Sequence, residues 1–185
     1  MVLVHSPICD FGAKAPEFSL ADTAGRLWTL QACAGSNGLL VCFICNHCPY
    51  VQAINQKLVR DTLELQELGV NSVAIMSNDY TAYPEDAPDR MRKLARALGY
   101  PFPYLLDETQ KTARDYGAVC TPDFFGYNAN LELQYRGRLD DSGRHASRGD
   151  ARRELFLAMK QIAATGKGPA DQVATMGCSL KWRDS

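Results

Sequence analysis

The sequence lacks any long hydrophobic run. No segment approaches the ~20 apolar residues that a membrane-spanning helix needs, and the first residues, MVLVHSPICDFGAK, have no basic start followed by a sustained apolar core. A surplus of charge is lacking too, because 20 basic and 21 acidic residues leave a net charge of −1. No electrostatic field therefore favours nucleic acid or an anionic membrane as a partner. We expect a cytoplasmic protein that binds neither.

Internal repeats and low-complexity segments are also missing. The 185 residues are 46% hydrophobic and 22% charged, an ordinary globular composition that suffices for one core but is short for two domains. We expect a single domain over residues 1–185, with a core of about 12–165 and a C-terminal tail, 166–185. Seven cysteines are an odd number in such a chain. This count argues against a complete disulfide framework and for reduced thiols with a reactive subset.

The segment most informative about chemistry is 39–51, LLVCFICNHCPYV. Its first part, Leu39–Ile44, is a short apolar run typical of a buried parallel strand. Pro49 suits the first position of a helix, and apolar residues follow at helical spacing until Gly69 stops the pattern. Cys48 therefore lies at the helix N-cap, where free backbone N–H groups and the positive end of the helix dipole stabilise a thiolate. A thiolate is the nucleophilic form of cysteine.

The rest of the chain alternates strand and helix patterns. The expected elements are a hairpin over 18–30, strands at 70–76 and 104–106, helices at 91–98 and up to 116, a hairpin over 124–135 and a final helix over 155–162. Strands that alternate with helices require a parallel sheet with crossover connections, and the late hairpin adds antiparallel strands. The sequence predicts an α/β fold with a central mixed sheet flanked by helices and an N-terminal β-hairpin extension.

This order of elements, with the residues at their joints, resembles the thioredoxin-like superfamily, specifically the redoxins that include peroxiredoxins and thiol-disulfide oxidoreductases. The resemblance runs from Gly12 to about Ile162. The segment GAKAPEFSL is similar to the first segment of peroxiredoxins, and the stretch from LLD to YGA resembles the one that leads to their cis-proline. Together ICNHCPYV, AVCTPDFF, YRGRLDD and GCSLKW resemble a peroxiredoxin-like, AhpC/TSA-type subgroup.

The resemblance implies which cysteine attacks. When Phe43 is matched to the last core phenylalanine of the thioredoxin strand, Cys48 falls on the attacking cysteine of the family C-x-x-C and Val51 on the second one. Cys45 falls where peroxiredoxins carry a threonine three residues before their reactive cysteine. Its sulfur reaches Cys48 only if the Cα atoms are less than ~7 Å apart, so its role stays open here.

Further site residues follow from the same resemblance. The pair Thr121-Pro122 matches the Thr/Ile-cis-Pro of thioredoxins, which in the family lies against the reactive sulfur and pairs with substrate backbone. Cys120 is placed near Cys48 and competes with Cys45 as the resolving thiol. Cys178, in a Gly-Cys-Ser tail, either folds back to pair or stays mobile.

His47 is adjacent to Cys48, where an imidazolium would lower the thiol pKa or protonate a leaving thiolate; the alternative is a solvated loop histidine. Two residues depart from the peroxiredoxin pattern, since Val41 replaces a proline and Thr121 replaces an arginine that helps bind peroxide. Arg138 and His47 are the other donors available for a peroxide.

We therefore expect an enzyme, a thiol-disulfide oxidoreductase with Cys48 as nucleophile and an intramolecular disulfide to Cys45, by preference, or Cys120. One alternative is a peroxiredoxin-like, antioxidant thiol peroxidase. A second is a zinc or copper site built from Cys45, His47, Cys48, Cys120 and Cys178. The substrate would be a protein or small-molecule disulfide or a hydroperoxide, with a thiol reductant, no cofactor and no physiological metal; a homodimer stays open. The expected catalytic residues are Cys48, Cys45, Cys120, His47, Thr121 and Pro122.

Overall fold

The computed structural model describes residues 2–142 and 151–183. The strands are β1 (Leu3–His5), β2 (Ser19–Asp22), β3 (Leu27–Thr29), β4 (Gly38–Phe43), β5 (Val70–Met76), β6 (Tyr104–Leu106), β7 (Cys120–Thr121), β8 (Asp123–Asn128), β9 (Leu133–Tyr135) and β10 (Met176–Ser179). The helices are α1 (Leu30–Cys33), α2 (Pro49–Glu67), α3 (Pro88–Leu98), α4 (Lys111–Tyr116) and α5 (Glu154–Thr165), and a 3-10 turn covers Pro84–Asp86. No helix in the described ranges has the length and apolarity to cross a bilayer.

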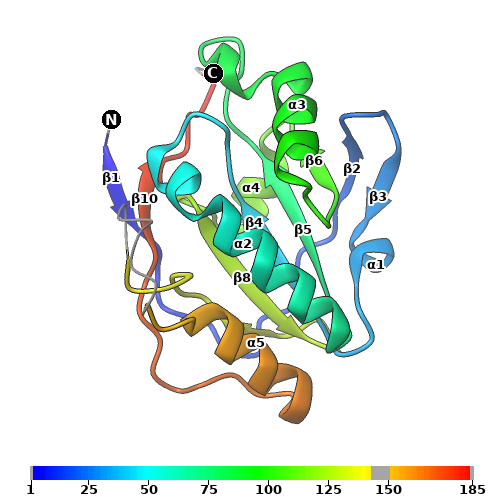
Figure 1. The fold of residues 1–185 in the computed structure, drawn as a ribbon, viewed down its shortest axis with the longest axis vertical. Coiled ribbons are helices and arrows are strands. Elements are labelled where there is room, and N and C mark those ends of the chain that lie inside the picture. The colour runs from blue at the N-terminus through cyan, green and yellow to red at the C-terminus, as the bar shows by residue number, and fades with distance from the viewer. Residues whose placement is uncertain (1, 143–150, 184–185) are drawn as a thin grey trace.

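The strands form a large and a small sheet (Figure 1). The large sheet has seven strands in the order β3-β2-β6-β5-β4-β8-β9, and the small one has three in the order β1-β10-β7. The central strand β4 runs parallel to β5 and antiparallel to β8. This arrangement confirms the predicted α/β fold with a central mixed sheet flanked by helices.

Alternation along β4 divides the hydrophobic core between the two faces of the large sheet. Leu40 and Cys42 face one cluster, which α2, α3 and α5 complete. Leu39, Val41 and Phe43 face the other, to which α1 and α4 contribute. Every residue of β4 is buried, which explains why this strand is a continuous apolar run in the sequence.

Helix α2 begins and ends as the sequence predicts. Pro49 occupies the first helical turn, and Cys48 is the N-cap with extended backbone angles, φ −72° and ψ 120°. Gly69 follows the last turn with φ +75°, a left-handed conformation that glycine adopts without steric cost. The helix therefore starts directly beyond the carboxyl end of β4 and carries Cys48 to that edge of the sheet.

Two features add detail to the sequence prediction. The predicted hairpin is β2–β3, and β2 also pairs with β6, with Ala21 opposite Leu106, so the hairpin extends the large sheet at its edge. The tail expected outside the core contains β10, which pairs with β1 and β7. Cys178 and Leu180 in this tail are 1% and 4% exposed and pack in the two core clusters.

Candidate thiol active site

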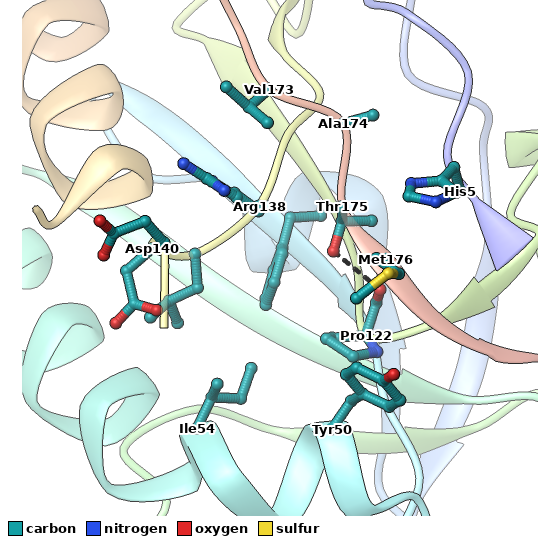
Figure 2. Close-up of a pocket in the computed structure, with 13 residues that line it drawn as sticks. His5, Tyr50, Ile54, Pro122, Arg138, Asp140, Val173, Ala174, Thr175 and Met176 are labelled. Carbon is teal, nitrogen blue, oxygen red and sulfur yellow. Dashed lines mark hydrogen bonds between the residues drawn. The ribbon is translucent and has the colours of Figure 1, made fainter. Parts of the chain in front are cut away.

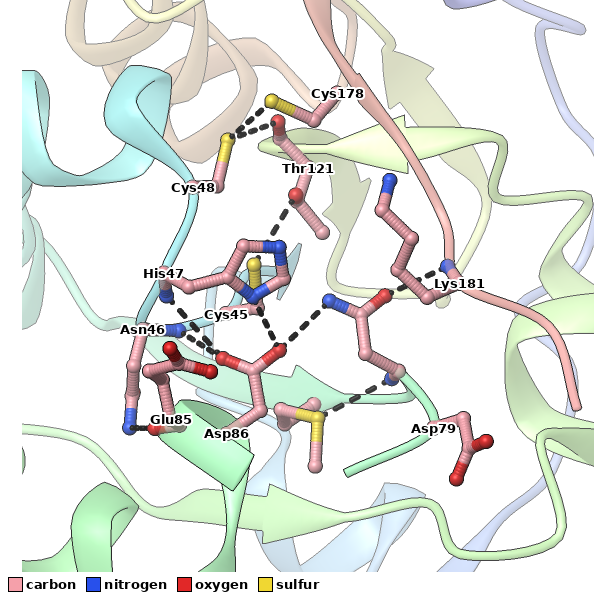
Figure 3. Close-up of polar contacts among 12 residues, drawn as sticks. Cys45, Asn46, His47, Cys48, Asp79, Glu85, Asp86, Thr121, Cys178 and Lys181 are labelled. Atoms are coloured by element: carbon pink, nitrogen blue, oxygen red, sulfur yellow. Dashed lines mark hydrogen bonds and ion pairs between the residues drawn. The ribbon is translucent and has the colours of Figure 1, made fainter. Parts of the chain in front are cut away.

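Cys48 lies where three segments that are distant in sequence meet (Figure 3). Its side chain, at the start of α2, is completely buried. The Cys48 thiol donates to the backbone carbonyl of Thr121 in β7, with Sγ and O 3.1 Å apart. On β10, the Cys178 Sγ also lies 3.1 Å from the Cys48 Sγ. Two thiols that are 130 residues apart in the sequence are therefore in contact at a helix N-terminus.

The neighbouring donors make Cys48 an acidic thiol. Hydrogen bonding from the Cys45 thiol is the largest cause, and the Cys178 thiol and the Val51 N–H add to it, so that the pKa of Cys48 falls to about 5 despite burial. The same contact and burial hold the pKa of Cys45 well above its usual range. Burial and then the Cys48 contact raise the pKa of Cys178 to about 12. Near neutral pH one sulfur carries the negative charge, and its neighbours keep their protons.

Strand β10 lies close against the Thr121-Pro122 peptide, which is cis as the resemblance implies. In the antiparallel register, Cys178 is opposite Thr121. Gly177 lies over the same peptide so closely that a Cβ there would be 2.2 Å from the Thr121 carbonyl oxygen. The Thr121 hydroxyl is 3.4 Å from the Cys45 Sγ. Thr121 thus contacts the Cys48 sulfur through its backbone and the Cys45 sulfur through its side chain, and it lies opposite Cys178 in the strand pairing.

His47 is an ordered part of the site rather than a solvated loop histidine. Its Nδ1 lies 2.7 Å from Asp86 Oδ2, and its ring stacks on Tyr83 with centroids 5.0 Å apart. Asp86 is completely buried and also accepts the backbone N–H groups of Asn46 and His47, at 2.8 and 3.2 Å. The hydrogen bond that His47 donates to Asp86 raises the pKa of His47, since it stabilises the imidazolium.

Asn78 joins this carboxylate to the C-terminal segment. Its side-chain Nδ2 donates to Asp86 Oδ2 at 2.9 Å, and its Oδ1 accepts the backbone N–H of Lys181 at 2.9 Å. Neither Asn78 nor Asp86 is predicted from the sequence. Their only signal is their place in the Asp- and Pro-rich segment 78–89, and nothing local distinguishes Asp86 from its neighbour Glu85.

The chain is similar to proteins of one known family. The model of the AhpC/TSA family matches residues 11–142. The chain belongs to the AhpC/TSA family. This membership confirms the thioredoxin-like redoxin resemblance and indicates a thiol oxidoreductase or a thiol peroxidase. No match was found among curated proteins.

Solved structures extend the comparison over the whole chain. A conserved protein from Geobacillus kaustophilus is 39% identical with a TM-score of 0.92, covering 100% of this chain and 98% of that one. A hypothetical protein from Sinorhizobium meliloti 1021 is 37% identical with a TM-score of 0.92, covering 98% and 99%. Peroxidoxin BcpB from Mycobacterium tuberculosis, at 15% identity and a TM-score of 0.63, covers 84% and 98% and shares the fold alone.

Within this AhpC/TSA chain, the other predicted residues have different surroundings. Cys120 belongs to β7, but its thiol donates to the Pro122 carbonyl at 3.4 Å, and burial raises its pKa. Arg138 forms a two-pronged ion pair with Glu154, both N–O distances being 2.8 Å. The guanidinium that the sequence offers as a peroxide donor is therefore committed to another partner.

Proposed function

We propose that the protein is a thiol-disulfide oxidoreductase in which Cys48 is the nucleophile and Cys178 the resolving thiol. The observation that carries this proposal is the 3.1 Å separation of the two Sγ atoms, about 1 Å longer than a covalent S–S bond of ~2.05 Å. The pKa values of about 5 and about 12 support the division of roles. The acidic thiol is ready to attack, and the other keeps its proton until it is needed.

The proposed reaction is a thiol-disulfide exchange in two steps. The Cys48 thiolate attacks one sulfur of a substrate disulfide, forms a mixed disulfide and releases the other sulfur as a thiolate. Cys178 then loses its proton and attacks Cys48, forming the Cys48–Cys178 disulfide and releasing the second substrate thiolate. The substrate gains two electrons and two protons, and the protein dithiol loses them. A thiol reductant must restore the dithiol before the next turnover.

His47 supports the second half of this exchange. The Asp86 hydrogen bond is the first cause of its raised pKa and favours the imidazolium form of the ring. An imidazolium stabilises the thiolate of Cys48 when it is the leaving group and supplies a proton to a departing thiolate. Asp86 acts through His47 and is a positioning residue.

Resolution by Cys178 differs from the pairing with Cys45 or Cys120 that the sequence favours. We assign Cys45 a supporting role, because its Sγ lies 3.4 Å from the Thr121 hydroxyl and its thiol is the largest cause of the low pKa of Cys48. Cys120 directs its thiol to the Pro122 carbonyl. Peptide mapping of the oxidised protein distinguishes the three pairings, and a Cys48–Cys45 or Cys48–Cys120 linkage in the wild type would contradict the proposal.

Peroxide reduction is the first alternative, and family membership supports it. A peroxidase needs donors aimed at the peroxide oxygens as the thiolate attacks. Arg138 is paired with Glu154, so of the two donors that the sequence offers for a peroxide only His47 remains. We therefore rank disulfide exchange first. A stopped-flow comparison of hydrogen peroxide, an organic hydroperoxide and a protein disulfide tests the ranking, and rapid Cys48-dependent oxidation at low micromolar peroxide would reverse it.

Metal binding is a second candidate because one donor set is compact. Cys45 Sγ, a His47 ring nitrogen and an Asp86 oxygen lie within 4.8 Å of one another. A thiolate, an imidazole and a carboxylate suit zinc. Metal analysis of freshly purified protein, compared with the Cys45→Ser variant, tests this candidate. A stoichiometric zinc content that Cys45→Ser abolishes would favour a metal site over a free dithiol.

The decisive experiment for the oxidoreductase proposal uses three single variants and a disulfide substrate. Cys48→Ser should abolish the reaction, and Cys9→Ser, at a half-buried cysteine far from the site, should leave it unchanged. Cys178→Ser should still attack the substrate once but stop at the mixed disulfide, which mass spectrometry detects. Full turnover by Cys178→Ser would show that another thiol resolves the intermediate.

A further inference from the structure

Strand β10 covers the thiolate that must react. Cys48 is completely buried, and β10 pairs with β7 on one side and β1 on the other. Because Cys178 of β10 lies against the Cys48 sulfur, movement of β10 away from β7 would open a path to Cys48 for a disulfide from outside. The backbone edge of β7, exposed by that movement, is then able to pair with another extended segment.

The side chains of β10 indicate what such a segment would present. Residues at alternate positions of a strand point to the same face, so Met176 and Cys178 point the same way. Cys178 meets Cys48, and Met176 lines a cavity of about 330 Å³ beside it (Figure 2). Pro122 and Tyr50 also line this cavity, which places it directly beside the thiol pair. Its volume is in the usual range for ligand pockets.

The lining suits an uncharged apolar side chain. Ile54, Phe124 and Leu139 contribute apolar walls. Among the charged groups of the lining, Asp140 binds Lys57 at 2.7 Å and Arg138 binds Glu154 at 2.8 Å, and Asp141 is a further acidic residue. A negatively charged side chain entering the cavity would lose water and face Asp140 and Asp141, whereas an apolar one would gain burial.

Gly177, between Met176 and Cys178, has no room for a side chain. A Cβ at Gly177 would lie 2.2 Å from the Thr121 carbonyl oxygen and 2.7 Å from its carbonyl carbon. Both are backbone atoms and cannot rotate away. A segment that replaces β10 in the same register therefore meets the same restriction.

We propose that β10 occupies the site at which the substrate binds, and that the substrate is an extended protein segment of the pattern apolar–Gly–Cys. The cysteine of that segment is in a disulfide. The segment displaces β10, pairs with β7, places its apolar side chain in the cavity and presents its cysteine sulfur where Cys178 now lies. The inference rests on the proposed function. Cys48 attacks that sulfur, the substrate S–S bond breaks, and the other sulfur leaves as a thiolate.

The test uses the full-length Cys178→Ser protein and peptides that copy residues 174–181, ATMGCSLK, each as a mixed disulfide with 5-thio-2-nitrobenzoate, whose release is followed by absorbance. One peptide is unchanged, one has Glu in place of the methionine, and one has Val in place of the glycine. The reaction of each peptide with a free dithiol corrects for intrinsic reactivity. We expect each altered peptide to react at least about tenfold more slowly, as the loss of one buried side chain implies.

Two further variants separate the possible outcomes. Adding Gly177→Ala should push β10 away from Thr121 and accelerate all peptides without changing their order. Adding Ile54→Trp, which narrows the cavity, should remove most of the advantage of methionine over glutamate. Corrected rates within twofold of each other for all peptides would overturn the inference but keep the exchange activity. Absence of release from every peptide, with Gly177→Ala included, would refute the proposed function itself.

Discussion

Two buried cysteines, one inside the large sheet and one beside the small sheet, have pKa values shifted in opposite directions. Cys42, in the middle of β4, and Cys48, at the start of α2, are 1% and 0% exposed and belong to the same core cluster. Burial alone raises the pKa of Cys42. At Cys48, hydrogen-bond donors outweigh burial and lower the pKa to about 5. Burial alone does not decide whether a thiol is acidic; the donors around the sulfur do.

The two regions differ in whether backbone N–H groups are available to a sulfur. In the sheet interior, β4 is paired along both edges, with β5 and β8, so its N–H groups are already used. At the start of a helix the first N–H groups have no partner within the helix. The Val51 N–H is one of these and is among the causes that lower the pKa of Cys48. A thiolate is stable only where such donors remain available.

The largest expected contrast between the two regions is in alkylation. In the reduced wild type, iodoacetamide should modify Cys48 with a midpoint near pH 5 and leave Cys42 unmodified. At pH 7 the ratio should exceed about 100-fold, because a thiol of ordinary pKa is only a few per cent ionised there. Mass spectrometry of tryptic peptides measures both sites, with denatured protein as the control. A Cys48 midpoint near pH 8.5 would remove the contrast.

Removing the main hydrogen-bond donor should raise the pKa of Cys48, which is the direction in which burial shifts the pKa of Cys42. Cys45→Ala deletes the thiol that contributes most to the low pKa, so the midpoint of Cys48 alkylation should rise and its rate at pH 5.5 should fall about tenfold. Cys120→Ala is the matched control and should leave the midpoint unchanged. The Cys48–Cys178 disulfide should still form in Cys45→Ala. Its loss would identify Cys45 as the resolving thiol.

A smaller effect is expected from Asp86→Asn. Asp86 raises the pKa of His47, so the variant should lower it, and an NMR titration of the ring should detect the shift. Because the folded pKa is raised, the stabilisation by this pair is present below the unfolded value of about 6.5 and is lost as pH rises through the folded value. The stability difference between wild type and variant should therefore shrink above that pH. An unchanged His47 titration would contradict the role given to Asp86.

The smallest effect on reactivity is expected in the sheet interior. Cys42→Ala should lower the free energy of unfolding by about 1–2 kcal/mol, because it deletes a buried sulfur and leaves a small cavity. The alkylation rate and midpoint of Cys48 should stay within about twofold of the wild type, since the two sites share no donor. Urea unfolding and alkylation of the same samples measure both quantities. A large change at Cys48 would mean that the two regions are coupled through the sheet.

Local patterns predicted the parts of the fold that depend on neighbours in sequence. The apolar run of β4, the proline at the start of α2 and the glycine after it fixed Cys48 at the N-cap, and the structure agrees. Strand β10 escaped prediction because its four residues, MGCS, have no strand pattern and its partners β1 and β7 lie far away in the chain. Asp86 escaped for the same reason, being 39 residues from His47.

The side-chain amide of Asn78 has a thermodynamic consequence for this site. It holds Asp86 with its nitrogen and the Lys181 N–H with its oxygen, at 2.9 Å each. Protonation of His47 and detachment of the C-terminal segment therefore both affect the hydrogen bonds of the Asn78 side chain. Linkage between them is reciprocal, so whatever free energy imidazole protonation adds to closure of the segment, closure adds equally to retention of the proton. A substrate that displaces β10 would in this way change the acidity of the histidine that serves its own departing sulfur.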